Sequence, residues 1–214
     1  TSPAVMAAAC RWLLDQGARV RVADSPGFGT ATAVARKTGL TEALAPLGIR
    51  VEALEAPQRL ALDTGVSFPV SRLALESDLI LSAARVKTHS QMRLTLSVKN
   101  LFGCVSGLRK AVIHTRQGQE PDTFADCLAA LAAALPPSAG LLDGIVAMHE
   151  TGPSNGSPYP LGLLGASSSC VALDEAFCAL LGCAVEDVPL AASLARRGHA
   201  DCLANGCRPR YPLL

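Results

Sequence analysis

The alternation of apolar and polar residues along the chain predicts a series of helices and strands. Residues 4–16 place Val5, Ala9 and Trp12 at helical spacing. Residues 18–23 instead alternate valine with arginine, which is typical of a half-exposed strand. The same periodicities predict helices over residues 31–37, 41–47, 124–135, 171–181 and 188–197, and strands over residues 49–54 and 161–166.

Two mainly apolar runs give a different signal. Residues 79–84 and 140–148 are apolar apart from Ser82 and Asp143, and such runs are typical of strands buried on both faces of a parallel sheet. Residues 56–72 have no clear period and are predicted to be irregular. The repeated alternation of strand and helix therefore predicts an α/β fold, with a mostly parallel sheet flanked by helices.

The chain is predicted to form one α/β domain over residues 1–214, because it has no internal repeat and no linker. It begins with Thr1 and its helical pattern starts at once, so we expect a truncated or processed chain. No apolar run approaches the roughly 20 residues that cross a bilayer, since Pro136 and Pro137 interrupt the Ala/Leu-rich stretch. We expect a soluble protein, and a cytoplasmic one.

Composition narrows the class of protein. The chain has 19 Lys and Arg and 18 Asp and Glu, a net charge of +1, and only 17% charged residues. This balance excludes a disordered tail and a strongly basic nucleic-acid binder. The eight cysteines include no C-x-x-C spacing and lie mostly among apolar residues, which favours reduced, buried thiols over disulfides. None of their spacings matches the tight cysteine run of an iron–sulfur site, so no cofactor is expected within this chain.

The charges are unevenly distributed. Residues 79–119 hold seven Lys or Arg, two His and no acid, whereas residues 117–195 hold nine acids and no Lys or Arg. The basic segment, attached to the end of a buried strand, predicts a pocket for a small anion such as a carboxylate or phosphate. In the alternative interpretation, these cations pair with the acidic half of the same molecule.

Four residues of the basic segment are candidates for catalysis. The chain uses fifteen Arg and only four Lys, so a lysine marks a place where a compact, tunable ammonium is needed. Histidine exchanges protons near neutral pH, and it also serves as a structural residue. The candidates are Lys87, His89, Lys99 and His114.

Seven more residues are candidates for ligand binding. Asn100 offers a donor and an acceptor, Gly103 permits close backbone approach, and Asp143 interrupts an apolar strand where it must find a partner. Each also has an ordinary structural interpretation, such as a cap or an early-helix charge. The full set is Asn100, Gly103, Lys110, Asp143, Glu150, Gly152 and Asp174. No spacing supports a metal site at the histidines, and none is predicted.

The strings VKTHSQMRLTLSVKNLFGCVSGLRKAVIH and LLDGIVAMHETGPSNGSP resemble the family of domain of unknown function 362. The resemblance implies a prokaryotic α/β domain often joined to a ferredoxin-like module with two four-iron four-sulfur clusters. It implies that a lysine- and asparagine-bearing N-terminal strand is missing here, and that Ser169 and Cys170 replace the Asp-Pro common in the family. A shorter pattern is similar to lactate racemase, which implies a carboxylate substrate and proton chemistry by histidine.

The resemblance implies that the site of the family is formed here by the residues that match its polar motif positions. They are Lys87, His89, Lys99, Asn100, His114, Asp143, Gly152, Pro153, Gly156 and Asp174.

Three hypotheses about function follow. The first is a ligand-binding domain of a redox protein, which holds a small anion while an iron–sulfur module or partner supplies electrons. The second is a redox-free enzyme that uses His and Lys for proton or group transfer, and the third is a non-catalytic binding or assembly module. No nucleic-acid or membrane partner is expected, and the sequence leaves open whether the chain is an enzyme.

Overall fold

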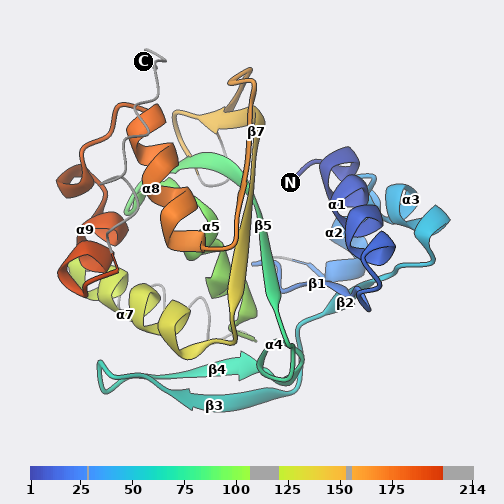
Figure 1. Ribbon diagram of the computed structural model, residues 1–214, viewed down its shortest axis with the longest axis horizontal. Coiled ribbons are helices and arrows are strands. Elements are labelled where there is room, and N and C mark those ends of the chain that lie inside the picture. Colours follow the sequence, from blue (N-terminus) through green and yellow to red (C-terminus); the bar gives the residue numbers. More distant parts are fainter. Residues whose placement is uncertain (28, 107–120, 153–155, 200–214) are drawn as a thin grey trace.

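The computed structural model describes residues 1–27, 29–106, 121–152 and 156–199. It confirms the α/β prediction, with a five-stranded sheet at the centre (Figure 1). The strand order is β6-β5-β7-β8, and β9 also pairs with β7. The strands of this sheet are β5 (Ile80–His89), β6 (Arg93–Thr95), β7 (Ser138–His149), β8 (Ser157–Tyr159) and β9 (Leu163–Ser167).

The sheet is mixed, and the prediction of a mostly parallel one was wrong on this point. Within it β5 and β7 run parallel, with Ala84 opposite Leu142, while β6, β8 and β9 all pair antiparallel to their neighbours. The cause is the length of the connections. A parallel crossover needs a dozen or more residues, and only the segment between β6 and β7 that contains helix α7 (Pro121–Ala134) is that long.

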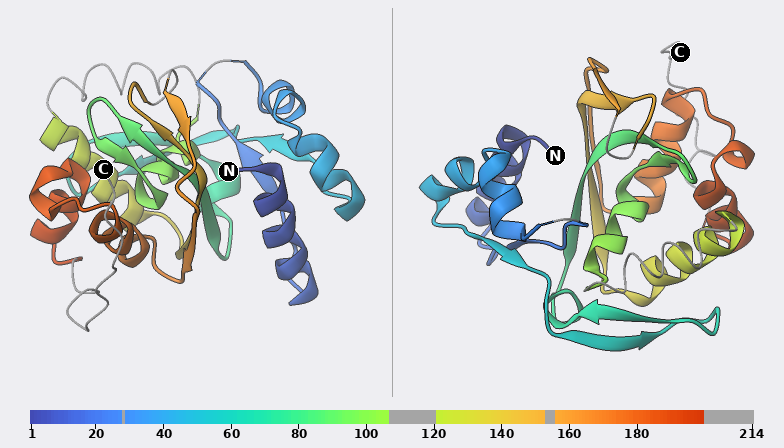
Figure 2. Two further views of the ribbon diagram at one scale, coloured as in Figure 1. Left: turned by 90° about the horizontal axis from the view of Figure 1, so that it is seen from above. Right: turned by 180° about the vertical axis from the view of Figure 1, so that it is seen from behind.

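Helices cover one face of this sheet, and the N-terminal elements lie on the other side (Figures 1 and 2). Ala84 and Val86 of β5 and Leu142 of β7 pack in one buried cluster with Leu173 and Phe177. The covering helices are α5 (Ser97–Asn100), α7, α8 (Cys170–Leu180) and α9 (Pro189–Arg196), with the short 3-10 helices η2 (Leu101–Cys104) and η3 (Val185–Asp187).

The largest core is aromatic at its centre. The Phe68 and Phe124 rings both meet Phe102 edge to face, with ring centroids 5.9 Å and 5.5 Å away, respectively. The three side chains are at most 5% exposed, and they join strand β4 (Ser67–Ser71), η2 and α7. This geometry adds to the stabilisation from burial alone.

The N-terminal elements have a separate small core. Parallel strands β1 and β2 pair Val22 with Val51, and Cys10, Val22 and Leu44 are buried together. Ser2 caps the first helix, since its hydroxyl accepts the Val5 N–H. These elements are α1 (Pro3–Asp15), β1 (Val22–Asp24), α2 (Ala31–Lys37), α3 (Leu40–Leu44), η1 (Ala45–Leu47) and β2 (Val51–Ala53).

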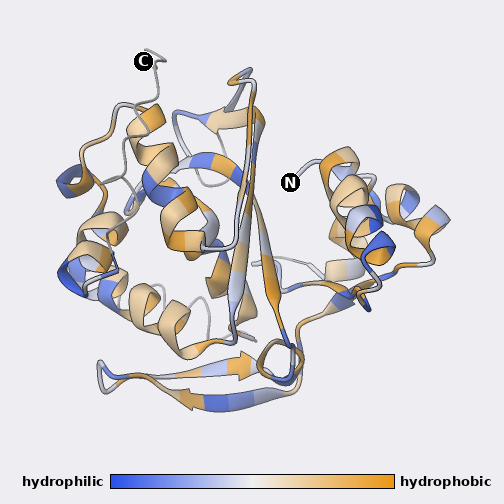
Figure 3. Ribbon diagram, in the orientation of Figure 1, coloured by the Kyte–Doolittle hydropathy of each residue, from blue (hydrophilic) through white to orange (hydrophobic). Residues whose placement is uncertain are grey.

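A β-hairpin occupies the stretch predicted to be irregular, so that prediction was wrong. Strands β3 (Pro57–Ala61) and β4 (Ser67–Ser71) pair antiparallel, followed by the single turn of α4 (Arg72–Leu75). β3 is largely exposed and polar, whereas Phe68 and Val70 of β4 are fully buried (Figure 3).

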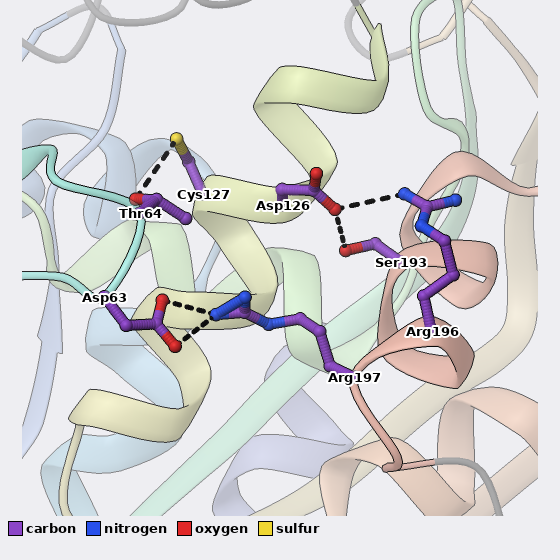
Figure 4. A network of polar contacts seen from close by, with 7 residues as sticks. All are labelled: Asp63, Thr64, Asp126, Cys127, Ser193, Arg196 and Arg197. Carbon is purple, nitrogen blue, oxygen red and sulfur yellow. Dashed lines mark hydrogen bonds and ion pairs between the residues drawn. The ribbon is translucent and has the colours of Figure 1, made fainter.

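Polar contacts hold helix α9 against its neighbours (Figure 4). Asp126 of α7 accepts hydrogen bonds from the Ser193 hydroxyl at 2.5 Å and from Arg196 at 3.1 Å. Arg197, just after α9, pairs with Asp63 in the turn of the β3–β4 hairpin. Helices α7 and α9 and the hairpin are thus linked at the surface.

Candidate functional site

A cleft of about 450 Å³ lies at the carboxyl ends of β5 and β7. This is the end of a parallel strand pair at which open α/β sheets bind ligands. Of the predicted site residues, the cleft brings together His89, Glu150 and Gly152. Arg93 and Asp187 complete its charged lining among the described residues.

His89 is the buried polar residue of the cleft. Its side chain is 4% exposed, and Nδ1 accepts the backbone N–H groups of Gln91 at 3.2 Å and Met92 at 3.3 Å. Because Nδ1 is an acceptor, a neutral ring carries its proton on Nε2. The turn after β5 therefore fixes the tautomer, so that His89 acts as a donor through Nε2.

Two residues of the cleft have unusual backbone conformations. Arg93 has φ of 59° and Glu150 has φ of 65°, and within the described residues Ala56 is the third non-glycine residue with positive φ. Such conformations cost free energy and occur often at binding sites. Arg93 also forms an ion pair with Asp187 at 3.1 Å, which joins β6 to η3 across the cleft.

The loop after β7 is held tightly against β5. The Thr88 hydroxyl donates to the Glu150 carbonyl at 2.9 Å, and the Ser157 hydroxyl donates to Glu150 Oε2 at 2.8 Å. A Cβ at Gly152 would lie 2.0 Å from the Thr88 carbonyl oxygen, a distance that no side chain tolerates. Gly152 is thus required for the approach of this loop to β5, whatever its role in ligand binding.

Lys87 lies on β5 but outside the cleft. It alternates with Val86, which packs under the helices, so Lys87 and Arg85 point to the opposite face of the sheet. Burial lowers the pKa of Lys87, the nearby Arg85 lowers it further, and Asp24 at the end of β1 acts in the other direction. We call this place, defined by Arg85, Lys87 and Thr95, the outer-face site.

Thr95 and Arg85 each contribute a buried polar atom to the outer-face site. Thr95 is opposite Lys87 in the antiparallel pair β5–β6, so the two side chains share a face. Thr95 is 6% exposed, and neither its hydroxyl nor Arg85 Nε has a hydrogen-bond partner among the described residues. Buried polar groups are nearly always paired with protein, ordered water or a ligand, so both atoms have the capacity to bind a further group.

Asp143 has hydrogen-bond partners, which a buried acid requires, but the sequence did not identify them. Its carboxylate accepts the backbone N–H groups of Ser2 at 2.6 Å and Ile145 at 3.3 Å. Burial acts to raise the pKa of Asp143, but these hydrogen bonds outweigh it and hold the pKa below its usual value. Arg85 lies opposite Asp143 in the sheet, yet no ion pair joins them.

β7 is irregular beside the outer-face site. Arg85 pairs with Asp143 and Lys87 with Met148, so four residues of β7 lie opposite the single residue Val86 of β5. Ile145 in this bulge is 46% exposed. Bulges of this kind are common next to functional sites, where they redirect side chains.

Three predicted residues lie in and after α5, away from the cleft. Asn100 donates from Nδ2 to the Ser82 hydroxyl at 3.1 Å, and Lys99 is half-buried beside it. A Cβ at Gly103 would meet no atom within 4 Å, so packing there does not require glycine. The structure does not bring these residues together with His89.

Asp174 caps the start of α5 from within α8. It accepts the Ser97 N–H at 2.8 Å and the Val98 N–H at 2.9 Å, and it also contacts the Ser97 hydroxyl. Burial is the main influence on this group and raises its pKa to about 7. The predicted acid therefore has a structural role in the fold, separate from the cleft.

Lys110, His114 and Pro153 lie outside the described residues. Sequence reasoning did not select Arg85, Thr95, Arg93 or Asp187 as site residues. The signal for Arg85 was present, because it is two residues before Lys87 and so lies on the same face of a strand. The contributions of Thr95 and Asp187 depend on strand register and helix packing, which the sequence does not display.

The described cysteines do not form a ligand set for an iron–sulfur cluster. Cys10 belongs to the N-terminal core, Cys127 to the main core and Cys178 to the core under the sheet. Burial raises the pKa of all three thiols, that of Cys178 to about 12. Across the described ranges, no group of three or more His, Cys, Asp or Glu is arranged to hold a metal ion.

Comparisons with known proteins give two matches. The family model described as Domain of unknown function (DUF362) matches residues 1–179. Thylakoid-associated protein sll1697 of Synechocystis sp. is 35% identical over 201 residues, which cover 92% of this chain and 62% of that protein. The chain thus spans less than two thirds of this relative's length. No solved structure matches the chain, and no helix in its described part is long and apolar enough to cross a membrane.

Proposed function

The chain belongs to the family named Domain of unknown function 362 (DUF362), as its motifs predicted, and within it we propose that this domain binds a small oxyanion at the outer-face site. The ligand group is a phosphate or carboxylate held by Arg85, Lys87 and Thr95. The single observation that carries the proposal is the buried Nε of Arg85, which has no partner among the described residues.

The donors of the outer-face site match an acceptor-rich ligand. A guanidinium, an ammonium and a hydroxyl all donate hydrogen bonds, and an oxyanion accepts several at once. Arg85 and Lys87 repel each other, which contributes to the lowered pKa of Lys87. An anion between them removes this repulsion and satisfies Arg85 Nε and the Thr95 hydroxyl together.

The neighbouring acids do not remove the need for this anion. Asp143 uses its carboxylate oxygens on the backbone N–H groups of Ser2 and Ile145. Asp24 accepts the backbone N–H of Ser25 at 2.7 Å, and its negative charge acts to raise the pKa of Lys87. The positive charge of Arg85 is therefore not matched by a direct ion pair within the described residues.

Calorimetric titration with inorganic phosphate at low ionic strength tests this proposal. We expect Arg85→Gln to weaken binding about tenfold or more, because a charge-assisted hydrogen bond is lost. Thr95→Val, which removes one hydroxyl at nearly constant volume, weakens it about fivefold. Arg59→Gln is the matched control, since Arg59 is exposed on β3 and its loss changes the net charge equally. Unchanged affinity in both Arg85→Gln and Thr95→Val refutes the proposal.

The redox part of the hypothesis stays a prediction from the family resemblance. It requires an iron–sulfur module or partner that is not part of the described residues. Anaerobic purification from the complete gene, with iron and sulfide analysis, tests it. Iron with matching sulfide supports an iron–sulfur module in the same protein, and protein without iron refutes such a module while leaving anion binding intact.

Proton transfer is the second candidate function, and His89 favours it. The ring is nearly buried, has a fixed tautomer and lines the cleft. Once a turned-over substrate is identified, His89→Gln is expected to lower kcat at least tenfold and to alter its pH profile. An unchanged kcat and pH profile excludes His89 as the acid or base. A domain that binds phosphate but turns over no substrate fits the third hypothesis, a binding module.

A further inference from the structure

The end of helix α8 brings two cysteines close together. Gly182 follows the helix with φ of 66°, and its N–H donates to the Ala179 carbonyl oxygen at 3.1 Å. The Cys183 N–H donates to the Cys178 carbonyl oxygen at 2.9 Å. Together these two hydrogen bonds form a Schellman motif, in which the side chains at the positions of Cys178 and Cys183 commonly contact each other.

The backbone at this motif suits a disulfide bond. With standard bond lengths, the 2.9 Å hydrogen bond limits the distance between the Cα atoms of Cys178 and Cys183 to about 7 Å. Disulfides join Cα atoms that are about 4–7 Å apart. Both residues carry free thiols and pack in the same core under the sheet. The thiols are also close enough for the charge of Cys183 to raise the pKa of Cys178.

The two thiols differ in their access to reagents. Cys178 is 2% exposed, and burial raises its pKa to about 12. Cys183 is half-buried, and its Sγ donates a weak hydrogen bond to the Leu181 carbonyl oxygen at 3.8 Å. Burial raises the pKa of Cys183 too, although the nearby Arg93 acts to lower it. A reagent therefore reaches Cys183 first, and Cys178 is placed to react with a group already bound there.

We propose that Cys178 and Cys183 form a redox-active dithiol, which a low-molecular-weight disulfide of the glutathione type oxidises to a disulfide. The Cys183 thiolate attacks one sulfur of this reagent, forms a mixed disulfide and displaces one thiolate. The Cys178 thiolate then attacks the Cys183 sulfur and displaces the second thiolate. The protein pair loses two electrons and two protons, which the two released thiols carry, and excess thiol reverses the reaction.

Equilibration of the native chain in mixtures of reduced and oxidised glutathione tests the proposal. After free thiols are blocked by alkylation, peptide mass spectrometry identifies which cysteines are joined, and circular dichroism confirms that the protein stays folded. We expect a Cys178–Cys183 disulfide to accumulate with oxidised glutathione and to disappear in excess reduced glutathione. Two thiols that stay free, or glutathione that stays on Cys183 without a bond to Cys178, overturn the proposal.

Variants assign the order of the two steps. Cys178→Ala removes the second nucleophile, so its Cys183 is expected to accumulate as a mixed disulfide with glutathione. In Cys183→Ala, modification of Cys178 is expected to be at least about tenfold slower, because this thiol is buried. Cys10→Ala is the matched control and retains the disulfide, since Cys10 is also 2% exposed but belongs to the N-terminal core. Equal rates of modification in the first two variants refute the assignment of Cys183 as the entry point.

Discussion

An asparagine in place of Asp174 changes how the stability of the protein depends on pH. The carboxyl group is buried between α8 and α5 and faces the N–H groups of Ser97 and Val98. Burial raises its pKa from 3.8 to about 7 in spite of those donors. The Ser97 hydroxyl also contacts the Cys170 carbonyl oxygen at 3.1 Å. Its single proton serves only one acceptor, which favours a protonated Asp174.

The direction of the pH dependence of stability follows from the protonation of Asp174 in the folded and the unfolded protein. Between about pH 4 and pH 7 the folded protein keeps the proton of Asp174 and the unfolded chain releases it, so stability falls as pH rises. A shift of about three pH units at about 1.4 kcal/mol each sets an upper limit of about 4 kcal/mol on this loss. Asparagine is neutral at every pH and has the shape of the protonated acid, so the Asp174→Asn variant does not lose this stability as pH rises.

Urea unfolding at intervals from pH 4.5 to pH 8 measures the effect. The free energy of unfolding of the wild type, minus that of Asp174→Asn, is expected to fall by about 2–4 kcal/mol over this range. The subtraction removes the titration of all groups common to both proteins. Asp15→Asn, at an exposed position at the end of α1, is the control and follows the wild-type pH dependence. A difference that stays constant or grows with pH refutes the reasoning.

Three substitutions and one control substitution test the packing around the cleft and in the core. Gly152→Ala is expected to cost about 1–3 kcal/mol, because its Cβ collides with Thr88, whereas Gly103→Ala has open space and costs less than about 0.5 kcal/mol by thermal unfolding. Phe124→Ala removes a fully buried ring and is expected to cost about 3–5 kcal/mol in urea, and a cost below 1 kcal/mol contradicts the aromatic core. Ser193→Ala breaks the buried end of the α7–α9 contact and is expected to cost about 1–2 kcal/mol, with no change in phosphate affinity.

The helices were predictable because their signal is local. Apolar residues at helical spacing located the main helices to within a few residues of their observed bounds, and α2 matches its predicted range, residues 31–37. β5 was predicted only to residue 84, yet it continues to His89. Arg85 and Lys87 were interpreted as the end of the strand, although their alternation with Val86 is itself a strand pattern with one polar face.

The hairpin was missed for a related reason. Pro57 and Pro69 argue against a central strand, but proline is tolerated at the edge of a sheet. The sequence does contain a turn residue at this place, Gly65, which adopts φ of 78° between β3 and β4. The burial of Phe68 and Val70 depends on contacts with η2 and α7, which are distant in sequence.

The strand position of the candidate residues was predictable, and their arrangement was not. The sequence pointed to cations and histidine at the end of a buried strand, and β5 carries Lys87 and His89, while their role as a binding site stays a prediction. It could not show that Lys87 and His89 serve different places, because this depends on the turn after β5 and on the register of β6. Nor could it show Asp174 against α5, a contact between residues 77 positions apart.

The separate core of the N-terminal elements bears on the order in which the protein assembles. β1 and β2 pair within residues 22–53, so the contacts described for this small core can all form once that stretch has left the ribosome. β5 pairs with β7, which begins some 58 residues after the start of β5. The apolar face of β5 therefore stays unprotected until β7 has been synthesised. The Ser2–Asp143 hydrogen bond joins the two parts only after β7 has been synthesised. During synthesis the small core of the N-terminal elements can therefore form before the central sheet is complete. The incomplete sheet is the part of the chain that is prone to aggregate at this stage.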